Sequence, residues 1–300
     1  MKVAFLLGAA IAAAFAVEAA AQQPDFSKAE VKVTDLGNRT YMLEGVGGNI
    51  TVAVGTDAVI MIDAQFAPMH DKIKAAVDAA TNKLPIRYVV NTHFHGDHTG
   101  GNAPFAGDGA VITAHENVRK RLAAGTMNGL NGNKTPPVTG AGLPGNVYTD
   151  ELTLKIDGRT AELKHVANAH TDGDTYVYWT EANVLSTGDT FVTGRYPNID
   201  FANDGNIKGM IEASDRYLKL VNDQSKIVPG HGSLATKADL VAYRAMLVEA
   251  RDRMTKLIAE GKSEADAIAA RPFADYDQKL GVADQASQNF IRVVYHSLKP

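Results

Sequence analysis

The sequence predicts an α/β (α+β) protein in which two β-sheets pack face to face and helices cover their outer faces, a four-layer αββα sandwich. Short strand-like runs joined by glycine- and asparagine-rich turns come first, and strand–helix units follow them. The same succession occurs again in the second half of the chain. Because every sheet and helix has an apolar side to bury, two such halves are expected to stack into four layers.

The first 21 residues have the features of a bacterial-type secretory signal. Lys2 supplies a positive charge, residues 3–17 are almost all apolar, and three alanines ending at Ala21 form an A-x-A cleavage site. The alternative is a membrane anchor, although a spanning helix usually needs about 20 apolar residues. We therefore expect cleavage after Ala21 and one domain over residues 22–300. The mature protein would be periplasmic or secreted and would not bind a membrane.

The first half of this domain contains four expected strands, separated by Gly-Asn, Gly-Gly-Asn and Gly-Thr-Asp turns. These strands cover residues 31–34, 39–43, 50–54 and 58–62. Helical periodicity follows over residues 69–80, where Ile73 and Val77 share a face. Pro85 stops the helix, and residues 86–90 form an apolar strand.

The second half repeats this style. Strands are expected at residues 110–113, 152–156, 161–166, 175–179 and 184–186. Helices are expected at residues 207–220, 237–260 and 283–296. Between them, residues 125–150 contain six glycines and three prolines without clear periodicity. A stretch of this kind predicts a functional loop or a disordered segment.

Composition excludes several classes of function. The chain has 300 residues, a net charge of −4 and no cysteine. The charge leaves no basic surface for nucleic acid. The absence of cysteine rules out disulfides, thiolate nucleophiles and every cysteine-ligated metal site. Oligomeric state leaves no trace in the sequence.

A cluster of metal-ligand side chains directly follows the strand at residues 86–90. His93, His95, Asp97 and His98 lie within six residues. Imidazole and carboxylate are the ligand types that zinc accepts when thiolates are absent. His93 and His95 are two apart, so they can point the same way from an extended segment. This density favours a metal site over a histidine-rich surface loop.

This H-x-H-x-D-H run, preceded by Asn-Thr and followed by Thr-Gly-Gly-Asn, resembles the metallo-β-lactamase superfamily. Three later motifs occur in the order that this family shows. His170 lies in Ala-His-Thr-Asp-Gly-Asp, Asp189 in Ser-Thr-Gly-Asp-Thr, and His231 in Pro-Gly-His-Gly. The resemblance extends over residues 49–232.

The resemblance implies two metal ions, expected to be two zinc ions per chain, with iron or manganese as alternatives. The first ion would be held by three histidines: His93, His95 and His170. The second would be held by Asp97, His98 and His231, and Asp189 would bridge the two. Coordination lowers the pKa of bound water, so a metal-bound hydroxide would attack the acyl carbon of a cyclic amide, lactone or ester. Asp97 would orient this nucleophile and shuttle its proton.

Some residues depart from the β-lactamase pattern. Asp189 stands where the cysteine-containing β-lactamases have cysteine. An aspartate at this position is similar to glyoxalase II and the lactonases. Val192 stands where those β-lactamases have a substrate-binding lysine. Arg195 is the nearest cation, and it is either a clamp for a substrate carboxylate or a solvated loop residue. Asp63 follows an apolar strand and is either a hydrogen-bonding partner of the metal loop or a strand-end turn residue.

These observations predict an exported dinuclear zinc hydrolase of small molecules with weak or promiscuous β-lactamase activity. The alternatives are a lactonase or thioesterase similar to glyoxalase II, a mononuclear iron persulfide dioxygenase of the same fold, and a protein that holds metal without catalysis.

Overall fold

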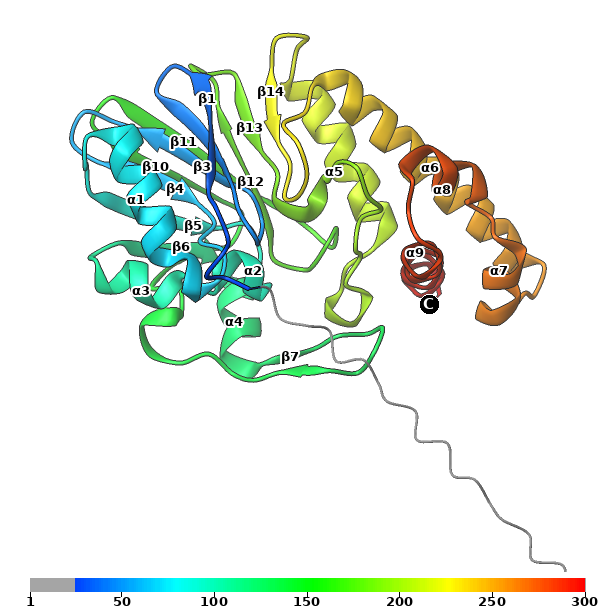
Figure 1. Ribbon diagram of the computed structural model, residues 1–300. Coiled ribbons are helices and arrows are strands. Elements are labelled where there is room, and N and C mark those ends of the chain that lie inside the picture. Colours follow the sequence, from blue (N-terminus) through cyan, green and yellow to red (C-terminus); the bar gives the residue numbers. More distant parts are fainter. Residues whose placement is uncertain (1–24, 300) are drawn as a thin grey trace, which may run out of the picture.

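In the computed structural model, which describes residues 25–299, two β-sheets lie face to face between layers of helices (Figure 1). The four-layer αββα prediction is confirmed. The expected signal segment, residues 1–21, lies outside the described residues.

The first sheet has seven strands in the order β1-β2-β3-β4-β5-β6-β9. Its strands are β1 (Lys32–Gly37), β2 (Thr40–Glu44), β3 (Ile50–Val54), β4 (Val59–Ile62), β5 (Ile86–Asn91), β6 (Val111–His115) and β9 (Asn146–Tyr148). Strands β1 to β4 are antiparallel, and β4, β5, β6 and β9 are parallel. The carboxyl ends of the parallel strands therefore lie at one edge.

The second sheet has five strands in the order β10-β11-β12-β13-β14. Its strands are β10 (Glu151–Ile156), β11 (Arg159–Val166), β12 (Asp174–Trp179), β13 (Val184–Ser186) and β14 (Lys226–Val228). Only the β13–β14 pair is parallel within this sheet.

Helices cover the outer face of each sheet (Figure 1). Those beside the first sheet are α1 (His70–Thr81), α3 (Asn102–Gly107) and α4 (Glu116–Ala124). Those beside the second are α5 (Ile207–Leu220) and α6 (Lys237–Ala259), and α7 (Glu264–Ala270), α8 (Ala274–Leu280) and α9 (Asp284–Leu298) lie beyond them, where α9 packs against α5, α6 and α7. A further short helix, α2 (Gly96–Thr99), carries part of the histidine cluster.

The alternation of side chains along each strand explains the layers. In β4, Ile60 and Ile62 face the second sheet and join Trp179 in the core between the sheets. Val59 and Met61 point the other way and pack with Ile73 of α1. Because successive strand side chains point to opposite faces, a strand of four buried residues must be covered on both sides.

Residues 125–150 contain more regular structure than the sequence predicted. They form a two-stranded hairpin of β7 (Thr126–Met127) and β8 (Lys134–Thr135), followed by β9 at the edge of the seven-stranded sheet. These strands have two or three residues each, too few to establish a periodic pattern. Strand β14 was missed for the same reason.

No helix within residues 25–299 is both long and apolar enough to cross a membrane.

Candidate metal centre

The histidine cluster lies where β5 ends and α2 begins. His93 and His98 are buried, whereas His95 and Asp97 are partly exposed. The amides of Asn91 and Asn102 exchange two hydrogen bonds of 2.9 and 2.8 Å and so join the two ends of this segment. The loop is therefore held in a compact shape by its own flanking residues.

The later predicted residues reach the same place from the second sheet. His170 lies between β11 and β12, Asp189 follows β13, and His231 follows β14. Asn49, directly before β3, donates hydrogen bonds to the carbonyls of Pro229 and Gly232 on either side of His231. The site thus lies beyond the carboxyl ends of parallel strands, where α/β sheets commonly bind ligands.

Three histidines form the first group of potential ligands. The Nδ1 atom of His95 lies 3.1 Å from His93 Nε2 and 2.9 Å from His170 Nε2. Together with a carboxylate oxygen of Asp189, these atoms lie within 4.8 Å of one another. Three imidazoles and a carboxylate that converge in this way can hold one metal ion.

Asp97, His98 and His231 form the second group, again within 4.8 Å of one another. His231 Nε2 lies 3.1 Å from Asp97 Oδ2 and 3.4 Å from His98 Nε2. The sequence prediction thus placed the seven side chains in the two groups that the structure brings together. Their role as ligands remains a proposal.

Asp189 lies between the two groups. Its Oδ1 is 3.2 Å from His98 Nε2, and its Oδ2 is 3.5 Å from His231 Nε2 and 3.7 Å from His170 Nε2. Oδ1 is buried and has no hydrogen-bond partner among residues 25–299. A buried carboxylate oxygen without a partner is costly, so this position fits an oxygen that ligates a cation.

Four of the histidines donate a hydrogen bond to a neighbouring oxygen from the ring nitrogen that faces away from the site. His93 Nδ1 donates to Thr92 Oγ1, and His170 Nδ1 donates to the carbonyl of Asn198, at 3.0 and 2.8 Å. His98 Nδ1 donates to the carboxylate of Asp63, and His95 Nε2 donates to that of Asp200. Each bond leaves the opposite nitrogen free and directed into the site, which is the tautomer that a metal needs.

Asp63 supports both the loop and a histidine. It accepts hydrogen bonds from the backbone N–H and the hydroxyl of Thr92 and from His98 Nδ1, at 2.7, 2.8 and 2.8 Å. Its side chain is only 1% exposed, and its φ of +66° is unusual for a residue other than glycine. These contacts match the first of the two expectations for Asp63, a hydrogen-bonding partner of the metal loop.

Asp200 was not predicted and occupies the corresponding place behind His95. His95 Nε2 donates to Asp200 Oδ2 at 2.9 Å, and Asn203 Nδ2 donates to the same oxygen at 2.8 Å. Arg121 of α4 in turn donates to Asn203 Oδ1. No local motif marks Asp200, because its partner lies 105 residues earlier in the chain.

The charges around the site favour a cation. Burial lowers the pKa of His93 well below its usual range, and burial also lowers that of His170 to about 4, so both rings are neutral. Burial opposes a charge on His231, but Asp189 and Asp97 raise its pKa to about 9. In the second group, the carboxylates of Asp97 and Asp189 thus favour the positively charged form of His231. A metal ion can take the place of the proton that gives His231 this charge.

Two glycines make this close approach possible. A Cβ at Gly48 would overlap the ring of His98, and a Cβ at Gly230 would overlap Oδ1 of Asp189. Both positions therefore require a residue without a side chain.

Arg195 is exposed and forms no hydrogen bond or ion pair with another residue in the described part of the chain. It lies in the segment after Asp189, beside Tyr196 and Asn198. This placement leaves open both the carboxylate clamp and the solvated loop residue.

Comparisons with known proteins agree with this geometry. The family described as the metallo-beta-lactamase superfamily matches residues 43–231, which include all seven side chains. A 2,4-dinitroanisole O-demethylase subunit alpha from Nocardioides sp. is 29% identical over 66% of this chain and 54% of its own. A hydroxyacylglutathione hydrolase from Polaromonas sp. is 29% identical over 61% and 65%, and a type 2 metallo-beta-lactamase from Bacteroides fragilis is 22% identical over 77% and 90%. The chain spans about half and just under two thirds of the first two relatives, respectively.

Solved structures share the fold. A metallo-beta-lactamase from Pontibacter korlensis has a TM-score of 0.60 at 19% identity and covers 73% of this chain and 99% of its own. A stereoselective inverting sec-alkylsulfatase from Pseudomonas sp. has a TM-score of 0.65 at 17% identity and covers 89% and 50%, respectively.

Proposed function

Because the chain belongs to the metallo-beta-lactamase superfamily, we propose that it is a dinuclear zinc hydrolase that opens a cyclic amide, lactone or ester. The observation that carries the proposal is the arrangement of seven ligand-type side chains in two groups on either side of Asp189. A mononuclear iron site would use only one of these groups, so the second group favours two ions.

The chain's own residues define the chemistry. When bound, a pair of zinc ions lowers the pKa of a water molecule and polarises the carbonyl under attack. Asp97 is the more exposed of the two carboxylates in these groups, 28% against 12% for Asp189, and its Oδ2 lies 3.1 Å from His231 Nε2. With zinc bound, the Asp97 carboxylate would orient the attacking water and would accept the proton released by it. Asp63 and Asp200 keep His98 and His95 in place during this step.

The substrate proposal combines two features. The predicted signal in residues 1–21 supports export, which would bring the protein to the compartment where β-lactams act. Asp189 and Val192 differ from the cysteine and lysine of the cysteine-containing β-lactamases. We therefore propose that β-lactam hydrolysis is weak or promiscuous and that the native substrate is another lactone, amide or ester.

The test uses metal-loaded protein that begins at Gln22. A chromogenic cephalosporin, a lactone and p-nitrophenyl acetate are assayed before and after chelation, and bound metal is measured per chain. Two zinc ions and chelator-sensitive turnover are expected, with kcat/KM of about 10⁴ M⁻¹s⁻¹ or more for the preferred class. Asp189→Ala should abolish turnover, whereas Asp204→Asn, at an exposed carboxylate outside the site, should not. One ion per chain, or turnover that survives chelation, would contradict the proposal.

A second candidate is thioester hydrolysis. It is favoured by the aspartate at position 189 and by the 29% identity to a protein named hydroxyacylglutathione hydrolase. Assays with S-lactoylglutathione beside the lactone separate the two. A preference for the thioester by more than about tenfold in kcat/KM, which is about 1.4 kcal/mol of transition-state binding, would make it the better assignment.

A further inference from the structure

The turn at residues 47–49, directly before β3, lies beside all three members of the second group. In the sequence it is the Gly-Gly-Asn turn that separates two expected strands. The Gly48 N–H donates to the carbonyl of Asp97 at 3.0 Å. A Cβ at Gly48 would overlap the ring of His98, so the backbone of the turn packs directly against that ring.

Asn49 ties this turn to the loop that carries His231. Its side-chain amide donates to the carbonyls of Pro229 and Gly232 at 2.9 and 2.8 Å, and its backbone N–H donates to the carbonyl of Gly230 at 2.8 Å. Three hydrogen bonds from one residue therefore hold the loop on both sides of His231. Because Asn49 is only 8% exposed, water competes little for these bonds.

Gln65, in the segment after β4, holds the same turn. Its Nε2 donates to the carbonyl of Gly48 at 2.8 Å, and its Oε1 accepts from the N–H of Gly47 at 3.3 Å. The residue is fully buried, and its φ of +50° is uncommon for a residue other than glycine. Such a conformation persists only where the surrounding structure holds it. Both polar atoms of the Gln65 side chain are thus used on this turn.

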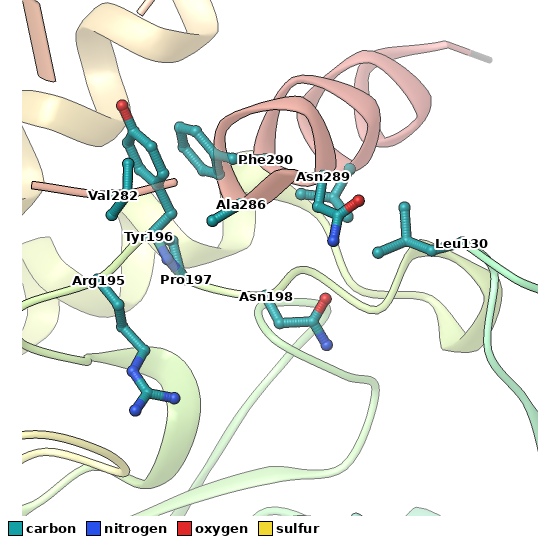
Figure 2. A pocket seen from close by; sticks show the side chains of 10 residues that line it. Leu130, Arg195, Tyr196, Pro197, Asn198, Val282, Ala286, Asn289 and Phe290 are labelled. Atoms are coloured by element: carbon teal, nitrogen blue, oxygen red, sulfur yellow. The ribbon is translucent and has the colours of Figure 1, made fainter. Parts of the chain in front are cut away.

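The first group is held by a different part of the chain. His170 and His95 donate to the carbonyl of Asn198 and to the carboxylate of Asp200, respectively. Asn198 lies across a cavity from helix α9 (Figure 2). Within residues 25–299, no hydrogen bond joins the 47–49 turn to a histidine of the first group. A change in the turn should therefore act on the second group.

We propose that Asn49 is a positioning residue for the second metal ion and that Gln65 fixes the turn from which it acts. Asn49 acts through the loop of His231, while Gly48 beside it holds the loop that contains the other two side chains. Three ligand-type side chains from two distant loops thus share one support. Loss of the partners behind metal ligands typically costs 10–100-fold in metal affinity. This inference rests on the proposed two-ion site.

Asn49→Asp replaces one side-chain nitrogen by oxygen and gives the sharpest test. A carboxylate cannot donate to the two carbonyls, but its negative charge would attract a nearby cation. Charge alone would therefore strengthen zinc binding, whereas a positioning role predicts that the second zinc binds at least about tenfold more weakly. Competition with a chromophoric chelator measures the two affinities. The binding step that His95→Ala weakens most belongs to the first group, and this step should stay unchanged in Asn49→Asp.

Asn38→Asp is the matched control. Asn38 Nδ2 also donates to a backbone carbonyl, that of Glu181 at 3.1 Å, but it lies in the turn between β1 and β2, at the opposite end of these strands. This variant should bind both zinc ions as the unchanged protein does. Gln65→Met removes the amide that holds Gly48 without adding a charge. It should also weaken the second zinc, so the inference stays testable if Asn49→Asp does not fold.

Hydrogen exchange in the metal-free protein tests the support without zinc. The Gly48 N–H, which donates to the carbonyl of Asp97, reports on the turn. The Thr193 N–H donates to the carbonyl of His231 at 3.0 Å and reports on the loop. Both should exchange at least about tenfold faster in Asn49→Asp, because local opening costs less free energy there. Both should exchange at the usual rate in the control variant.

Three results would overturn the inference: unchanged exchange of both N–H groups in Asn49→Asp, a second zinc that binds this variant as tightly as the unchanged protein or more tightly, or equal weakening of both zinc steps. If exchange rises as expected but the unchanged protein binds only one zinc ion, the proposed function fails and the positioning of these side chains by Asn49 stands.

Discussion

Replacement of Asp200 by alanine should weaken metal binding at one group of ligands and leave the other group unchanged. Asp200 Oδ2 accepts hydrogen bonds from His95 Nε2 and Asn203 Nδ2 at 2.9 and 2.8 Å, and the side chain is only 8% exposed. Alanine would free the His95 ring to rotate and to change its tautomer. The effect should be confined to the group that contains His95.

The size of the effect follows from these contacts. Loss of a partner behind a ligating histidine typically costs 10–100-fold in metal affinity, which corresponds to about 1.4–2.7 kcal/mol. Two donors share the one oxygen of Asp200, and both would lose a largely buried acceptor. We therefore expect a loss near the upper end of this range. Asp200→Asn keeps an acceptor without the charge, so its loss should be smaller.

Zinc titration in competition with a chromophoric chelator can resolve the two binding steps. Asp204→Asn is the matched control, because Asp204 lies on the same turn as Asp200 and its exposed carboxylate pairs with Arg121 of α4 but contacts no histidine of the site. Thermal unfolding of the metal-free variants checks that the fold is kept. The reasoning would be refuted if Asp200→Ala left both zinc affinities unchanged or weakened both equally.

Three further predictions concern the same centre. Asp189→Ala should reduce bound zinc to at most one ion per chain after dialysis, because Asp189 lies between the groups; two retained ions would argue against a bridge. Burial opposes the charge on His231, but Asp189 and Asp97 raise its pKa to about 9. Below about pH 9, zinc must displace the proton on His231 before it can bind there. The apparent zinc affinity should therefore rise between about pH 6 and 9, by up to about tenfold per pH unit for one proton released. An affinity that calorimetry finds independent of pH over this range would contradict this prediction. Gly48→Ala should weaken zinc binding at the second group at least tenfold, because its Cβ would overlap the His98 ring. Gly145→Ala, whose Cβ meets nothing within 4 Å, is the control and should bind zinc normally.

The sequence by itself predicted the layers and the cluster of ligand-type side chains. Strand alternation and helical periodicity are local, so α5 was predicted at its observed bounds, Ile207–Leu220. His93, His95, Asp97 and His98 lie within six residues at the end of one strand, where the backbone path alone brings them together. His170, Asp189 and His231 were found because motifs of known order surround them.

Tertiary structure decided what no local pattern encodes. Asp200 meets His95 across 105 residues, and β9 joins the first sheet as a strand of only three residues. One cavity is lined by Leu130, by the segment after Asp189 and by helix α9 near the end of the chain. Contacts of this kind depend on how layers pack and loops close, and no residue in them carries a signal in its immediate neighbours. The ligand-type side chains were therefore predictable from the sequence, whereas the partners that orient them required the fold.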